Sequence, residues 1–325
     1  MMPHAIAQDL PARRCVACGA SALVEGERIA TRDLIAAWRR EDVATGALDL
    51  IEPRTAAILS SLPPEVRFER CPSCGLEMAL PATVWSSSNY PRDQSYPVRW
   101  EFLRGVEDLG PDPIDVLEIG CGEGHFLEMA AARGHRAVGI DFSDTAVAKA
   151  QARGLRAFCG GFDELARHVG AAARFDAVAL FQVIEHLADP DEIFSALAAW
   201  TRPGARLLIA CPGPRRFTRL IREQQAGASD FWDYPPHHVL RWTLPALRAV
   251  VARHGWRVVE AMEEPFSWVA AGSQIGIARA IYHGRLDSPL GRRMSIAGAW
   301  LSLLMTPGAR AGVSLYLCAI RDASR

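Results

Sequence analysis

Residues 115–126, DVLEIGCGEGHF, carry a short apolar run into a glycine-rich turn and then into an amphipathic segment. This order is typical of a parallel sheet, in which a strand is followed by a turn and a crossover helix. Gly120, Gly122 and Gly124 would let a ligand approach the backbone closely and would expose amides at the start of the helix. The stretch predicts an α/β fold with a ligand site at this turn, although a tight connection without a ligand has the same pattern.

The apolar run at 115 begins a series of seven, separated by segments with helical spacing. The clearest helix is expected at Asp191–Trp200, which opens with acids and ends before a turn. We therefore expect an α/β, Rossmann-like, seven-stranded sheet. The predicted strands are DVLEI from 115, AVGI from 137, LRAF from 155, AVALF from 177, RLLIA from 206, WRVVEAM from 256 and VSLYLCAI from 313.

Asp141 ends the second of these runs, seventeen residues after Gly124. A carboxylate at this place can accept the two hydroxyls of a ribose. The fingerprint of a dinucleotide site requires glycine or alanine where this chain has His125. A third glycine at position 124, with Glu118 before the loop, favours a smaller ligand that carries an amine. A nicotinamide-dependent oxidoreductase is the disfavoured alternative.

The segment FDAVALFQVIEHLADP at 175–190 completes a family pattern. Together with the ExGxGxG turn and the acid after the second strand, it resembles class I S-adenosylmethionine (SAM) methyltransferases over roughly residues 100–260. The resemblance implies that Glu118 and the three glycines face the methionine part of SAM. Further cofactor contacts implied by it are Asp141 at the ribose, Phe142 at the adenine, Gly161, Phe162 and Asp163 along the adenine pocket, and Phe181 and Gln182 beneath the sulfonium.

More narrowly, the chain is similar to bacterial methyltransferases with a C-x-x-C pair before the domain and a P-x-H-H motif after the fifth strand. The matching stretches are CVACG at 15–19, CPSCG at 71–75, YPVRWEF at 96–102 and YPPHHVLRWT at 234–243. This resemblance implies an enzyme that methylates a small-molecule or glycan acceptor. It does not select the acceptor.

Methyl transfer from a sulfonium is an in-line displacement, and a hydroxyl acceptor must also lose its proton. Histidine is suited to accept that proton near neutral pH. His237 and His238 follow the fifth predicted strand, on the side where ligands bind in such sheets. Glu185 and His186 follow the fourth. The structural alternatives are that a histidine caps a helix or bonds a backbone carbonyl, and that Glu185 with His186 braces the cofactor loop. We favour transfer to oxygen over carbon or nitrogen.

Cys15, Cys18, Cys71 and Cys74 form two matched C-x-x-C-G knuckles. Four thiolates in this arrangement predict a structural zinc site of the ribbon type. The 52 residues between the knuckles exceed a compact ribbon, so a helical stretch around Thr31–Arg40 would have to loop out. A redox dithiol is the alternative, and a non-catalytic adaptor that uses the knuckles as an interaction surface is another.

The chain divides by composition into three parts. Residues 1–80 are expected to form the zinc-ribbon-like domain, 81–99 a linker or lid, and 100–325 the methyltransferase domain. Tyr96 lies in the lid and is expected to contact the methionine carboxylate of SAM. Residues 265–312 are expected to form a helical insertion, which would cover an acceptor pocket, form a dimer interface or touch a membrane surface.

Charge and hydropathy limit the partners. The 37 acidic and 36 basic residues nearly cancel, so no nucleic acid is expected. The N-terminal stretch lacks the pattern of a signal peptide, and the longest apolar stretch, Ile296–Met305, is too short for a bilayer span. We therefore expect a cytoplasmic protein.

Overall fold

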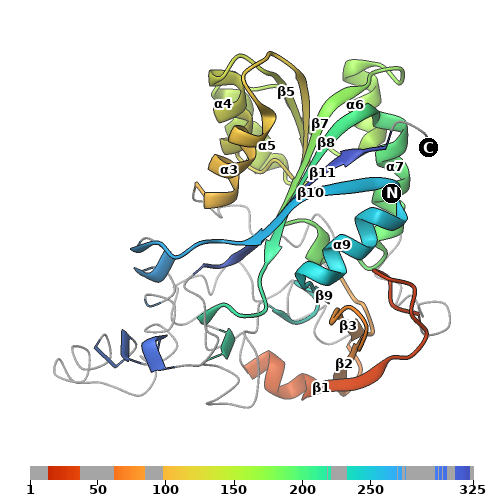
Figure 1. Ribbon diagram of the computed structural model, residues 1–325, viewed down its shortest axis with the longest axis vertical. Coiled ribbons are helices and arrows are strands. Elements are labelled where there is room, and N and C mark those ends of the chain that lie inside the picture. The colour runs from red at the N-terminus through yellow and green to blue at the C-terminus, as the bar shows by residue number, and fades with distance from the viewer. Residues whose placement is uncertain are drawn as a thin grey trace.

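The structure is a computed structural model that describes most of the chain (Figure 1). The described residues are 14–36, 62–84, 98–217, 219–220, 233–268, 270–272, 275, 297–298, 300–301, 303–305 and 312–322. They form a large sheet of seven strands and a small sheet of four.

The large sheet contains all seven strands expected from the sequence. Its order is β10-β11-β8-β7-β4-β5-β6, with β7 at the centre. Near one edge, β11 is antiparallel to both of its neighbours, β10 and β8. The central strands β4 and β7 are mostly apolar, as is typical of strands that helices cover on both faces. The bounds are β4 Asp115–Ile119, β5 Arg136–Asp141, β6 Ala157–Cys159, β7 Phe175–Phe181, β8 Thr201–Pro212, β10 Trp256–Glu263 and β11 Ser314–Arg321.

Helices form a layer on each side of this sheet, with α3, α4 and α5 on one side and α6, α7 and α9 on the other (Figure 1). The predicted helix at 191–200 is confirmed as α7, where the Asp189 side chain accepts the Asp191 amide and Pro190 occupies the first turn. The bounds are α3 Trp100–Leu109, α4 His125–Ala132, α5 Asp144–Ala152, α6 Phe162–Val169, α7 Pro190–Trp200 and α9 Leu244–Arg253, with a 3-10 turn, η2, at Ile184–His186.

The small sheet joins the cysteine-bearing segment to the second half of the chain. Its order is β1 (Val24–Ala30), β2 (Glu65–Arg70), β3 (Glu77–Leu80) and β9 (Leu240–Arg241). All its pairings are antiparallel. Because β9 lies within YPPHHVLRWT, the sheet ties the N-terminal strands to the segment that carries the paired histidines.

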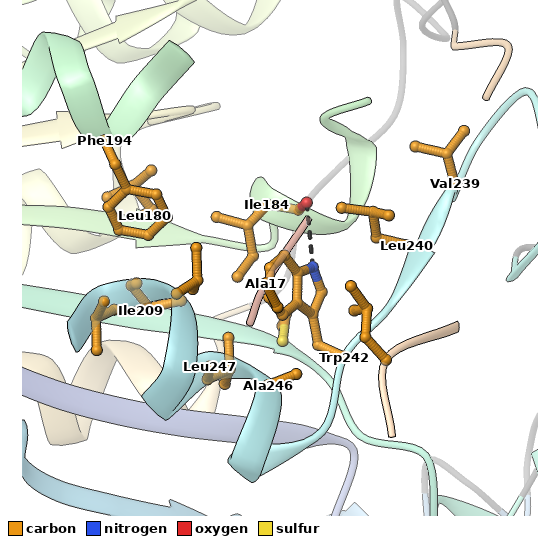
Figure 2. Close-up of a cluster of buried hydrophobic side chains, with 14 of the residues drawn as sticks. Ala17, Leu180, Ile184, Phe194, Ile209, Val239, Leu240, Trp242, Ala246 and Leu247 are labelled. Carbon is orange, nitrogen blue, oxygen red and sulfur yellow. Dashed lines mark hydrogen bonds between the residues drawn. The ribbon is translucent and has the colours of Figure 1, made fainter. Parts of the chain in front are cut away.

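Trp242, next to β9, is buried where η2, α9 and the first cysteine knuckle meet (Figure 2). Its indole nitrogen donates to the carbonyl of Ile184 at 3.2 Å. Ala17, Ala246 and Leu247 surround the ring (Figure 2). The two sheets therefore share one hydrophobic core.

Several predicted segments lie partly outside the described residues. Residues 31–36 are helical, as expected for the start of the Thr31–Arg40 stretch, and the described residues between 297 and 305 are helical too. Tyr96 and most of 265–312 lie outside. Among the described helices, none has the length and apolar character needed to cross a membrane.

Candidate active site

The turn after β4 requires glycine at alternate positions. Gly120, Gly122 and Gly124 have φ values of 75°, 50° and 80°, a region that other residues rarely adopt. A Cβ on Gly120 would lie 2.5 Å from Cγ2 of Val183, and one on Gly124 would lie 2.6 Å from Cδ1 of Leu155. The loop thus packs closely against its neighbours, while Gly120 and Gly122 remain partly exposed.

Asp141, at the end of β5, fixes this loop. Its carboxylate accepts the backbone amide of Gly122 at 2.8 Å and that of Ser143 at 2.8 Å. Burial raises the pKa of Asp141, and the bonds from the backbone amides oppose this effect. The structure therefore brings Asp141 to the glycine turn, as a ribose-binding acid would require.

Glu118 lies on β4 directly below the turn and is 2% exposed. Among the described residues, no group bonds its Oε2. Burial, and then the nearby Asp141, raise the pKa of Glu118 well above its usual range. A buried carboxyl oxygen without a partner is costly, and an amine would satisfy it. This orphaned oxygen, with the open glycine turn, fits the methionine end of SAM.

The residues predicted at the adenine differ in their surroundings. Phe142 is 58% exposed, and its ring edge lies 3.8 Å from where a Cβ of Gly161 would stand. Phe142 and Gly161 thus face each other across open surface. Phe162 instead stacks on Trp200, with ring centroids 5.8 Å apart, and Asp163 is exposed in the first turn of α6.

Phe181 is the last residue of β7, and Gln182 follows it. Phe181 is buried, and its ring packs against Phe102 and Phe126 at centroid distances of 5.5 and 4.9 Å. Gln182 has φ of 57°, and its amide donates to the buried Glu101 at 2.9 Å and to Ser314 at 3.3 Å. The side chain of Phe181 thus packs in the core, and that of Gln182 bonds to α3. Val183, which the sequence did not single out, touches the glycine turn.

The two predicted catalytic pairs, Glu185 with His186 and His237 with His238, form one cluster. Ligand-type atoms of His186, His237 and His238 all lie within 4.8 Å of one another. The ring centroids of His237 and His238 are 4.2 Å apart, and those of His186 and His238 are 4.8 Å apart. The cluster forms because the segment that leads into β9 brings His237 and His238 against η2, where the Val239 amide donates to the Glu185 carbonyl at 3.0 Å.

Glu185 lies in this cluster and is 1% exposed. Within the described part of the chain, neither of its carboxyl oxygens has a hydrogen-bond partner. Burial raises the pKa of Glu185 to about 8. His186 is neutral, because burial and His238 lower its pKa to about 3. Its Nδ1 lies 2.7 Å from the His237 carbonyl and must donate to it.

Asp233 orients His238 and was missed by the sequence analysis, although it stands next to the YPPHH stretch. Its Oδ1 lies 3.1 Å from Nδ1 of His238, and its Oδ2 pairs with the buried Arg216. Burial would raise the pKa of Asp233, but Arg216 and the bond to His238 outweigh this and place it well below the usual range. Asp233 is thus an ionised partner that fixes the ring of His238.

The four predicted cysteines come together. The Sγ atoms of Cys15 and Cys74 are 3.5 Å apart, as are those of Cys18 and Cys71. Four sulfurs around a tetrahedral zinc ion lie about 3.8 Å apart, since each Zn–S bond is about 2.3 Å. All four thiols are free of disulfides, so this donor set fits a zinc ion.

The cysteine knuckles are linked to the histidine-bearing segment by polar contacts. The Thr243 hydroxyl donates to the Cys74 carbonyl at 2.5 Å, and Arg253 donates to the Val16 carbonyl at 2.8 Å. Arg241, buried beside the ring of Phe68, binds Glu27 of β1 at 2.7 Å and Glu77 of β3 at 3.1 Å.

Comparisons with known proteins identify methyltransferases as relatives of this chain. The chain is 30% identical over 244 residues to a ubiquinone biosynthesis O-methyltransferase of Methylobacterium sp., covering 71% of this chain and 88% of that protein. It is 29% identical over 171 residues to the enzyme of that name from Leptothrix cholodnii, covering 47% and 71%. The matches to three further relatives cover only 40 to 42% of their length.

A solved structure with a similar fold is phosphoethanolamine N-methyltransferase 2 of Haemonchus contortus in complex with SAM. It has a TM-score of 0.47 and 17% identity, and the match covers 73% of this chain and 57% of that one. A family model described as a methyltransferase domain matches residues 96–261. The chain therefore belongs to the methyltransferase domain family and is a SAM-dependent methyltransferase.

Proposed function

We propose that the protein transfers the methyl group of SAM to an oxygen of a small-molecule or glycan acceptor. In this reaction the acceptor oxygen forms a bond to the methyl carbon while the carbon–sulfur bond breaks. The hydroxyl proton leaves, and the products are the methyl ether and S-adenosylhomocysteine. Exclusion of water and alignment of the three reacting atoms would supply most of the rate.

SAM would lie against the glycine turn. Glu118 with Gly120, Gly122 and Gly124 would hold its methionine end, Asp141 its ribose, and Phe142 with Gly161 its adenine. The orphaned oxygen of Glu118 and the exposed ring of Phe142 support these roles. Gly161, which lies close to Phe142, is favoured as a contact of SAM. The other predicted contacts are less favoured because their side chains face the core or solvent or bond to other elements: Phe162, Asp163, Phe181 and Gln182.

The observation that carries the choice of acceptor is the ionised Asp233 behind His238. A carboxylate that accepts from Nδ1 leaves Nε2 of the ring as the basic atom. His238 would therefore assist loss of the hydroxyl proton, with His237, His186 and Glu185 lining the same place. The two curated relatives described above are named O-methyltransferases, which supports an oxygen acceptor. Transfer to carbon or nitrogen is the second candidate.

Cys15, Cys18, Cys71 and Cys74 would hold a structural zinc ion. The 3.5 Å sulfur distances and the matched backbone of the two knuckles support this role. Gly19 and Gly75 both have φ of 77°, and their amides donate to the carbonyls of Cys15 and Cys71 at 2.8 Å. A closed set of four thiolates has no open position for a substrate.

The function is tested by incubating the full chain and SAM with phenolic, sugar and amine acceptors, and by locating the new methyl group in the product by NMR. We expect an O-methyl product, and a His238→Gln variant should lower kcat by about 100-fold while S-adenosylhomocysteine still binds. His168→Gln, on the exposed side of α6, is the matched control. A C-methyl or N-methyl product, or full activity of His238→Gln, would contradict the proposal.

A further inference from the structure

The cluster beyond the end of β7 contains the side chains that transition metals prefer. Imidazole nitrogens with a carboxylate are typical ligands of Zn²⁺, Fe²⁺ and neighbouring ions, whereas Mg²⁺ prefers oxygen alone. We propose that His186, His237 and His238, with Glu185, bind a divalent first-row transition ion. This site is distinct from the cysteine cluster, and binding at it does not depend on the proposed acceptor.

The distances suit a site that closes on its ion. Glu185 Oε1 lies 3.9 Å from Nε2 of His186 and 4.0 Å from Nε2 of His238. The three histidine atoms lie within 4.8 Å of one another. Ligand nitrogens around a tetrahedral ion lie roughly 3.4 Å apart. Side-chain shifts of about 0.7 Å each would bring even the widest pair to that spacing.

In two of the histidines, the ring nitrogen that faces away from Glu185 is hydrogen-bonded, as is usual for histidines that bind a metal. The Nδ1 atom of His186 donates to the His237 carbonyl, and Nδ1 of His238 lies against the carboxylate of Asp233. Such bonds fix the tautomer and direct Nε2 toward the ion. In both residues Nε2 is the atom that approaches Glu185.

Glu185 supplies an independent observation. Its carboxyl group is almost fully buried, and neither oxygen has a hydrogen-bond partner in the described residues. An acid buried in this way must hold a proton or meet a cation. A divalent ion between Glu185 and the three imidazoles would satisfy the buried carboxylate.

The site has a consequence for catalysis that rests on the proposed function. Three histidines and one carboxylate can leave a coordination position open, and an acceptor hydroxyl bound there would have a lowered pKa. The hydroxyl would lose its proton to solvent, and its oxygen would then attack the methyl carbon. His238 would then assist loss of the proton by holding the ion, and the His238→Gln variant should still lower kcat.

Cobalt is the probe that separates this site from the cysteine cluster. The full chain, with the cysteine cluster loaded with zinc during expression, is titrated with Co²⁺ and followed by absorption spectroscopy. We expect one further equivalent to bind with visible ligand-field bands and without the near-ultraviolet sulfur-to-cobalt bands of a thiolate site. His186→Gln, His237→Gln and Glu185→Gln should each weaken this binding at least tenfold, and His168→Gln should not change it.

Binding of Co²⁺ only with sulfur bands, or an unchanged affinity in all three variants, would overturn the proposal. Circular dichroism and S-adenosylhomocysteine binding check that each variant is folded. If any of them does not fold, the titration of the wild-type chain still decides. Co²⁺ binding without any O-methyl product would remove the proposed function and leave the metal site standing.

Discussion

Individual residues at the glycine turn and in the histidine cluster depend on partners that come from other loops. Glu118, Asp141 and the glycines follow from a motif that is continuous along the chain. Val183 and Asp233 contact the predicted residues from other loops. Such contacts depend on where strand ends meet in space, and no local pattern records this.

Asp141→Asn should weaken S-adenosylhomocysteine binding at least tenfold, as measured by calorimetry. The carboxylate accepts two backbone amides that shape the turn, and each bond to a charged group contributes about 1.5–3 kcal/mol. An asparagine would turn an NH₂ group toward one of these amides. Asp112→Asn, in the exposed loop before β4, is the control. Equal affinity of the Asp141 variant and wild type would refute the role of the carboxylate.

Glu118 should make the unliganded protein less stable as the pH rises. Its pKa is raised in the folded state, so the unfolded chain releases the proton more readily and the free energy of unfolding falls above about pH 4.3. From pH 5 to pH 8, the free energy of unfolding in urea should fall for both proteins. We expect the fall to be smaller for Glu118→Gln than for wild type, by at least about 1 kcal/mol. Glu107→Gln, exposed on α3, should follow wild type. Parallel curves for all three proteins would show that Glu118 does not titrate in this way.

Among the elements, the apolar runs predicted every strand of the large sheet because each run is mostly apolar, and the central strands β4 and β7 are buried on both faces. The small sheet was not predicted. Strands β1 and β2 carry many charged residues, and β9 has only two residues, too few to show any periodicity. Pairing of β3 with β9 joins positions more than 150 residues apart, a contact that periodicity along the chain cannot reveal.

Thr243 tests the junction between the two sheets at the start of α9. Its hydroxyl oxygen accepts the Ala246 amide as the helix cap, and its proton goes to the Cys74 carbonyl. Thr243→Val keeps the shape and removes both bonds, so we expect a loss of about 1–2 kcal/mol in urea unfolding. Thr243→Ser keeps both bonds and should lose less. If valine and serine give the same stability, the hydroxyl is not the stabilising group.

At the scale of the whole molecule, the cysteine cluster and the histidine cluster belong to one packed unit. Trp242 joins their core, and Arg241 connects Glu27 and Glu77 of the small sheet to the Asp233 carbonyl, to which it donates at 3.1 Å. The N-terminal strands therefore support the loop that carries His237 and His238. A substitution at the cysteines should therefore disturb the histidine cluster through these contacts, although the cysteines themselves would not contact SAM.

Loss of the cysteine cluster should consequently lower both stability and turnover. We expect Cys71→Ser to lose one zinc ion per chain and to unfold at a clearly lower temperature, because the binding free energy of a structural zinc contributes to folding. Its methyl transfer should fall more than its S-adenosylhomocysteine binding, since the glycine turn lies on the large sheet and the histidines lie against the small one. Cys159→Ser, at an exposed single cysteine, is the control. Zinc content, thermal unfolding and kcat are measured on the same preparations. Wild-type stability after loss of zinc would show that the cluster does not support the fold, and a stable variant with full turnover would break the link to the histidine loop.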